Sequence, residues 1–262
     1  MNRVPAFRAG GAPQPVDPAT AGTPDLEALF AAQSAGASET GRMTYEDTVL
    51  KTVCLFVVLL ATAAVGWFAP GLTLVGAIVG LVLGMVNAFK RKPSPALIIV
   101  YAAAQGLFLG GISNLFTVYF GSVVLQAVVA TLTVFGVMLA LFASGKVRAS
   151  ARLTKVFLGA LIGYFVYSLV NVGLMVFGGV SSSLAFGLNS MTFMGIPLGL
   201  IVGILAVLMG AYSLVLDFEF IKNGVQNRAP RVYGWQGAFG LMVTLIWLYI
   251  EFLRLFAILS RN

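Results

Sequence analysis

Residues 236–259 read QGAFGLMVTLIWLYIEFLRLFAIL, and Glu251 and Arg254 are the only charged side chains in this stretch. A helix crosses the hydrocarbon of a bilayer, about 30 Å thick, with roughly 20 apolar residues, because each residue adds about 1.5 Å. Six earlier runs of similar length and character precede this one. We therefore predict seven membrane-spanning helices, with bounds at 48–69, 72–89, 95–114, 123–143, 153–177, 191–220 and 236–259.

The composition of the whole chain also indicates a membrane protein. Of its 262 residues, 59% are hydrophobic and 10% are charged, and the mean hydropathy is +0.97. Soluble domains devote about 25% of their residues to charge, so this chain could not cover a core with a polar surface. We predict an all-α, polytopic integral membrane protein, a seven-transmembrane-helix bundle over residues 44–262. Residues 1–43 lack a long apolar run and are rich in small and polar residues, which predicts a disordered cytoplasmic tail.

Lysine and arginine residues gather at alternate ends of the predicted spans. They lie in the tail and in the connections after the second, fourth and sixth spans, while the other three connections contain none. Basic connections are retained in the cytoplasm, so we expect a multi-pass cell-membrane protein with a cytoplasmic N-terminus and an external C-terminus. Anionic lipid headgroups then explain the net charge of +7, and no nucleic-acid partner is expected. Fourteen of the sixteen basic residues form this cytoplasmic set: Arg3, Arg8, Arg42, Lys51, Lys90, Arg91, Lys92, Lys146, Arg148, Arg152, Lys155, Lys222, Arg228 and Arg231.

The residue inventory excludes most classes of enzyme. The chain has no histidine, which removes the usual general base and the histidine ligands of metal sites. Cys54 is the single cysteine, so an intrachain disulfide and a cysteine-rich metal site are both excluded. Asp217 is the only aspartate in the predicted spans, whereas an intramembrane aspartyl protease needs two that face each other. We expect no enzymatic activity and no resident cofactor.

Three carboxylates follow Asp47 in the chain, namely Asp217, Glu219 and Glu251. An ionisable side chain in hydrocarbon is expensive unless it is paired or hydrated, so these residues are the leading candidates for an ion pathway. Glu219 precedes Lys222 by three residues near the cytoplasmic end, where a surface ion pair is the simpler explanation. For Asp217, a functional role and a salt bridge to a basic connection both remain open.

Polar side chains also follow one face of the last predicted span. Arg254 comes three residues after Glu251, so an intrahelical ion pair and a functional role are both open for Glu251. Thr244, seven residues before Glu251, lies near the same face, and the three side chains form a polar strip along the helix. Gln105 in the third span either lines a polar cavity or bonds a neighbouring helix.

Two motifs in the last third of the chain carry a resemblance to a known family. Residues 216–222 read LDFEFIK and residues 248–256 read LYIEFLRLF. Together with the seven spans, over residues 44–262, they resemble the Bax inhibitor-1 family. The resemblance implies a seven-helix bundle with a central last helix and a pH-sensitive calcium leak governed by two aspartates, on the sixth and seventh spans. It also suggests a bacterial member of the family, in the plasma membrane.

By this resemblance Asp217 takes the place of the aspartate on the sixth span, and two residues compete for the place on the seventh. The LYIEF motif puts Glu251 in the acidic position, whereas alignment from the Leu-Arg-aromatic motif puts Thr244 there. The predicted span bounds leave Asp217 and Glu251 about 15 Å apart along the membrane normal. A direct pair of carboxyl groups and a rearranged or missing gate, in a divergent branch of the family, therefore both remain open.

The expected activity is a leak of calcium or another cation, with Asp217 as gate or weak metal ligand and Glu251 as a second carboxylate on the path. Hard cations bind several oxygen ligands, so the few carboxylates predict a weak site completed by carbonyls, amides and water. Protonation would open the path by breaking a contact between Asp217 and a basic partner, for which Lys90 and Arg91 are the candidates.

The alternative is a non-transporting protein that modulates a stress response or membrane proteolysis through another membrane protein. A wet cavity lined by Asp217, Gln105 and Thr244 would favour the leak. A path blocked throughout by apolar side chains would favour the modulator.

Overall fold

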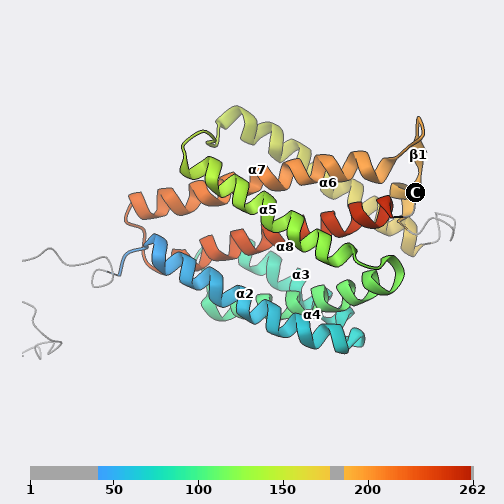
Figure 1. Cartoon of the computed structure of the whole chain (residues 1–262). Coiled ribbons are helices and arrows are strands. Elements are labelled where there is room, and N and C mark those ends of the chain that lie inside the picture. Colours follow the sequence, from blue (N-terminus) through green and yellow to red (C-terminus); the bar gives the residue numbers. More distant parts are fainter. Residues whose placement is uncertain (1–40, 178–185, 261–262) are drawn as a thin grey trace, which may run out of the picture. The chain divides into compact units, whose positions relative to one another are not determined.

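The computed structural model describes residues 41–177 and 186–260 of the chain. Within this part, seven helices are long and apolar enough to cross a membrane, so the all-α, seven-span prediction is confirmed (Figure 1). The predicted tail lies outside the described residues up to position 40. The helices are α2 (Tyr45–Phe68), α3 (Thr73–Phe89), α4 (Pro95–Phe120), α5 (Val123–Ala143), α6 (Ala151–Val176), α7 (Leu198–Gln226) and α8 (Tyr233–Leu259).

The sixth span was predicted at 191–220, and the structure corrects both of its ends. Residues 192–197 form an antiparallel hairpin whose turn residues, Met194 and Gly195, have φ angles of 52° and 83°. Pro197, which has no backbone N–H, immediately precedes α7. Apolar residues in such a hairpin have the same hydropathy as residues in a helix, which is why the run was read as one span. The short elements before α7 are η2 (Gly187–Ser190), β1 (Thr192–Phe193) and β2 (Ile196–Pro197).

Two helices end six residues beyond their predicted C-terminal bounds. Helix α7 continues through Lys222, which was assigned to the connection, because the backbone keeps its helical hydrogen bonds as far as Asn227. Helix α4 continues beyond residue 114 to Phe120 and stops at Gly121, whose φ of 69° suits glycine. The other spans begin and end within three residues of the predicted bounds.

Helix α8 is the most buried of the seven and packs against α2, α4, α5 and α7, as predicted for a central last helix. Glycines let α7 approach it closely. In one half of this contact the glycines belong to α7 and large side chains of α8 pack on them. The pairs are Gly199 with Ile258, Gly203 with Leu255, and Gly210 with Leu248.

In the other half of the α7–α8 contact the glycines belong to α8. Gly237 receives the side chain of Ile221, and Gly240 receives the carboxylate of Asp217. A Cβ atom at Gly240 would stand only 2.7 Å from Asp217 Oδ1. The absence of a side chain at position 240 therefore makes room for the acid between the two helices.

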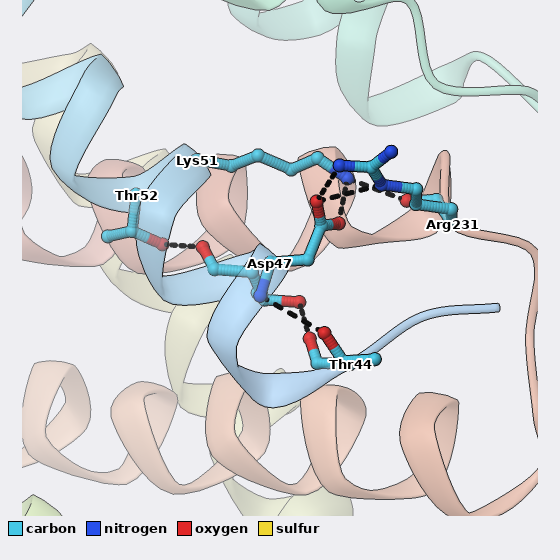
Figure 2. Close-up of polar contacts among 6 residues, drawn as sticks. Thr44, Asp47, Lys51, Thr52 and Arg231 are labelled. Atoms are coloured by element: carbon cyan, nitrogen blue, oxygen red, sulfur yellow. Dashed lines mark hydrogen bonds and ion pairs between the residues drawn. The ribbon is translucent and has the colours of Figure 1, made fainter. Parts of the chain in front are cut away.

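Residues 41–43 were predicted to belong to the disordered tail, and the structure instead places them against the α7–α8 connection. Met43 is only 2% exposed, and its backbone N–H donates to the Ala229 carbonyl at 2.8 Å. The Arg231 N–H donates to the Gly41 carbonyl at 2.8 Å. Thr44 then caps α2, because its Oγ1 accepts the Asp47 N–H at 3.1 Å (Figure 2).

A cluster of charges holds the start of α2 to the same connection, and we call Asp47, Lys51 and Arg231 the α2 clamp. Figure 2 shows the Asp47 carboxylate in contact with both basic side chains. Arg231 Nε donates to Asp47 Oδ1 at 2.9 Å, and Lys51 donates to Asp47 and to the Arg231 carbonyl, the latter at 2.7 Å. The hydrogen bond to Asp47 raises the pKa of the Arg231 guanidinium, so this residue stays cationic. The clamp joins two segments that are 184 residues apart in the chain.

Candidate functional site

Asp217 lies on the face of α7 that meets α8. Thr244 Oγ1, on α8, donates to Asp217 Oδ2 at 2.7 Å, and Ser213 Oγ, one turn before Asp217, lies 3.1 Å from Thr244 Oγ1. Residues four apart share a helical face, so Ser213 and Asp217 of α7 stand opposite Gly240 and Thr244 of α8. We call these four residues the Asp217 site.

The Asp217 site holds one carboxylate and two hydroxyl groups between two closely packed helices. Asp217 is half-buried, and Thr244 is 3% exposed. Among the described residues, no lysine or arginine nitrogen lies within 4 Å of the Asp217 carboxylate. A cation placed here would find few oxygen ligands, which makes the site a weak one. The described chain contains no cluster of three or more acidic, histidine or cysteine side chains suited to a metal ion.

Glu251 occupies a separate site farther along α8. It is 2% exposed and forms an ion pair with Arg254, three residues later on the same helix. The Tyr164 hydroxyl of α6 and the Trp247 indole, at 3.2 Å, also donate to Glu251 Oε1. Arg254 in turn donates to Tyr164 at 3.3 Å. The intrahelical ion pair, one of the two alternatives for Glu251, is therefore present in the structure.

The two acidic sites are separated by an apolar contact. Thr244 and Glu251 are seven residues apart on α8, a rise of about 10 Å. Between them Leu248 is fully buried and packs on Gly210 of α7. Of the two residues that competed for the place opposite Asp217, the structure brings Thr244 to it and leaves Glu251 with Arg254.

The remaining predicted residues lie away from the Asp217 site. Lys90 and Arg91 are exposed at the end of α3, and they form no ion pair within the described ranges. Gln105 of α4 packs against Gly80 of α3. Gln105 thus lies at the α3–α4 contact, whereas Asp217 and Thr244 lie at the α7–α8 contact.

The predicted surface pair of Glu219 and Lys222 is also not formed in the described structure. Glu219 Oε2 is buried, without a hydrogen-bond partner in the described chain. Lys222, inside α7, is half-buried.

The sequence analysis missed Ser213 and Gly240 in one site and Tyr164 and Trp247 in the other. A signal existed for three of them. Ser213 precedes Asp217 by four residues, Gly240 precedes Thr244 by four, and Trp247 precedes Glu251 by four. Each therefore shares a helical face with a residue already singled out. Tyr164 lies on another helix, so no local spacing points to it.

These observations define the class of the molecule. It is a polytopic α-helical membrane protein with an acidic site at the contact of its last two spans. A family model described as Bax inhibitor 1 like matches residues 21–261, and the chain belongs to this family. A comparison with curated proteins gives no match.

Proposed function

We propose that the protein is a pH-sensitive leak pathway for cations, with calcium as the ion and Asp217 as the group that controls it. The observation that carries this proposal is the half-buried Asp217 carboxylate, inside a span, without a basic partner among the described residues. A carboxylate in that position is expensive unless a proton, a cation or water compensates its charge. Protons and calcium ions would then compete for one group.

The change at the site would be local. The ionised carboxylate accepts the Thr244 hydroxyl at 2.7 Å and so joins α7 to α8. Addition of a proton removes the charge that attracts a cation and weakens this hydrogen bond, because bonds to ionised groups are about twice as strong as neutral ones. The contact between the two helices loosens next to the acid. The partner of Asp217 in this mechanism is Thr244, and Lys90 and Arg91 have no part in it.

The leak also needs a route between the Asp217 site and the opposite end of the bundle. Leu248 packs on Gly210 between Asp217 and Glu251, and in this proposal their contact blocks that route. A conducting state therefore requires α7 and α8 to separate at this contact. Glu251 and Arg254 would form the next polar group along the path.

The same apolar contact favours the second candidate function, a non-transporting modulator that acts through another membrane protein. In that function the Leu248 contact never opens, and the Asp217 site only stabilises the packing of α7 on α8. Under either function we propose that the protein is not an enzyme and holds no resident cofactor.

We further propose that the N-terminus is cytoplasmic and the C-terminus external, in a bacterial plasma membrane. The alternation of basic connections supports this orientation. The α2 clamp adds support, because it places the start of α2 beside the basic α7–α8 connection. Met43, Val147 of the α5–α6 connection and Val225 at the end of α7 belong to one apolar cluster, so three basic segments gather at one end.

Calcium flux into vesicles tests the leak. The protein, Asp217→Asn and the control Glu219→Gln, an acid two residues away on the same helix, are reconstituted in liposomes that contain a calcium dye. Flux is measured at pH values of about 6 and 8, which bracket the shifts that carboxyl groups undergo in proteins. We expect the parent and Glu219→Gln to show pH-dependent flux, and Asp217→Asn to lose that dependence. A folded parent protein that never exceeds protein-free liposomes at either pH overturns the leak and leaves the modulator.

A further inference from the structure

An apolar groove lies between α2, α4, α5 and α8, away from both acidic sites. Its cavity volume is about 540 Å³. The lining comes from residues 56–68 of α2 and 124–132 of α5, together with parts of α4 and α8. These are the second half of α2 and the first half of α5, so the groove lies in the half of the bundle away from the basic connections.

The groove offers water almost no free hydrogen-bonding groups. Its hydroxyl groups belong to Ser113, Thr131 and Tyr249, and each already has a hydrogen bond. Thr131 donates to the Ala127 carbonyl at 2.8 Å, and Ser113 bonds the Leu109 carbonyl and the Tyr249 hydroxyl, the latter at 2.6 Å. Water occupies cavities that give it two to four polar partners, whereas apolar cavities stay dry. An occupant of this groove must therefore be apolar.

The groove opens toward the lipid. Leu60 of α2 is 64% exposed and Leu132 of α5 is 60% exposed, and both line it. The inner wall is α8, through Ile246 and Tyr249. Bilayer hydrocarbon surrounds the spans, so acyl chains reach the mouth of the groove without crossing water. An unfilled groove would forfeit dispersion contacts along its whole lining.

The volume favours one acyl chain over a protein segment. A methylene group takes about the space of a water molecule, roughly 30 Å³. The cavity of about 540 Å³ therefore holds about eighteen such groups, close to the length of a common lipid chain. A helix with its side chains is about 10–12 Å wide and would need far more room. We propose that this groove is a binding site for one acyl chain of a bilayer lipid.

Photo-crosslinking tests the site. The protein is reconstituted in phosphatidylcholine and phosphatidylglycerol vesicles with a phospholipid that carries a diazirine in the middle of one acyl chain, and adducts are mapped by mass spectrometry. Ala64→Phe places a ring in the groove, which Ala64 lines. Ala61→Phe is the matched control, because Ala61 is also exposed on α2 but does not line the groove.

We expect adducts in the parent to concentrate on lining residues of α2 and α5. Ala64→Phe should reduce them roughly tenfold, which corresponds to about 1.4 kcal/mol of binding free energy, and Ala61→Phe should leave them unchanged. If Ala64→Phe does not fold, Val128→Trp fills the groove from α5 instead. Its control is Val129→Trp, because Val129 is exposed but does not line the groove. Labelling spread evenly over all exposed helix faces, or unchanged by both filling variants, overturns the proposal.

Discussion

Thr244→Val provides the sharpest test of the Asp217 site. The substitution keeps the size and branching of the side chain but removes the hydroxyl that donates to Asp217 Oδ2 at 2.7 Å and bonds Ser213 Oγ at 3.1 Å. In soluble proteins a hydrogen bond to a charged group contributes about 1.5–3 kcal/mol. Between membrane helices the measured average is about 0.6 kcal/mol, with a maximum near 1.7. We expect a loss of about 1–2 kcal/mol in the free energy of unfolding while Asp217 is ionised.

The loss in the free energy of unfolding should be larger at high pH than at low pH, because the charge on Asp217 strengthens the bond. At high pH the ionised Asp217 accepts the hydroxyl and the bond is strong. At low pH the protonated acid accepts it more weakly, so Thr244→Val should cost less, about 0.6 kcal/mol. In the Asp217→Asn background the cost should be small and independent of pH. The midpoint of the change in the parent background reports the titration of Asp217 itself.

Reversible unfolding in bicelles is measured for the parent, Thr244→Val, Asp217→Asn and the double variant. This double-mutant cycle gives the coupling energy between Asp217 and Thr244. Thr131→Val is the matched control, because Thr131 is 6% exposed and bonds only the Ala127 carbonyl of its own helix in the described structure. Its cost should not change with pH or with Asp217→Asn. A cost for Thr244→Val that is the same at every pH and in both backgrounds would refute the assigned role of the Asp217–Thr244 bond.

Three further predictions concern the other contacts of the bundle. Glu251→Gln leaves the half-buried Arg254 without its carboxylate partner and should destabilise the protein, by at most about 3–5 kcal/mol, the cost of breaking a fully buried pair. The double variant Glu251→Gln with Arg254→Gln should recover part of this stability. Unfolding in bicelles compares the two variants, and equal stability would contradict the ion pair. Arg231→Ala should speed amide hydrogen exchange at Met43, by less than roughly tenfold because exposed ion pairs contribute little, while Arg228→Ala, in the same connection, should not. Leu248→Ala should raise calcium flux in liposomes. Its control is Leu253→Ala, which should leave the flux unchanged, because Leu253 is as buried as Leu248 but packs on the α5 side of α8. Similar fluxes for both variants would show that Leu248 does not block the path.

The spans could be predicted because their lengths follow from the thickness of the bilayer, and hydropathy is a property of the sequence alone. The ends of α7 could not, because the hairpin at 192–197 and the last turns through Lys222 depend on backbone angles and not on hydropathy. The predicted bounds placed Asp217 and Glu251 about 15 Å apart along the membrane normal. In the structure Asp217 lies opposite Thr244, which is about 10 Å from Glu251 along α8.

The side chain that lies opposite Asp217 also could not be predicted from the spacing of residues within one helix. Glu251 and Thr244 lie near the same face of α8, so only the register between α7 and α8 decides which one Asp217 meets. That register is set by the glycine contacts, with Leu248 on Gly210 at one side of the site and Ile221 on Gly237 at the other. A spacing pattern within one helix carries no information about such a match between two helices.

The α7–α8 contact must open in the leak and stays closed in the modulator. The free energies of the Asp217–Thr244 bond and of the Leu248 packing limit how often it can open. A protonation event can shift the closed-to-open equilibrium only by the difference in its interaction with the two states. If that difference is the weakening of the Asp217–Thr244 bond on protonation, from about 1–2 to about 0.6 kcal/mol, it is about 0.4–1.4 kcal/mol, a change of roughly two- to tenfold in the equilibrium. Opening must also undo the packing of Leu248 on Gly210, and loss of one large buried side chain from its contacts costs about 2–5 kcal/mol.

Protonation alone therefore leaves the open state a minor population. A small, steady leak fits these magnitudes and a channel of high open probability does not. Leu248→Ala removes the packing of Leu248 on Gly210, which is the larger of the two free energies. Asp217→Asn removes the effect of protonation on the Asp217–Thr244 bond, which is the smaller. A leak protein should consequently respond more strongly to Leu248→Ala in the size of the flux, and to Asp217→Asn in its dependence on pH.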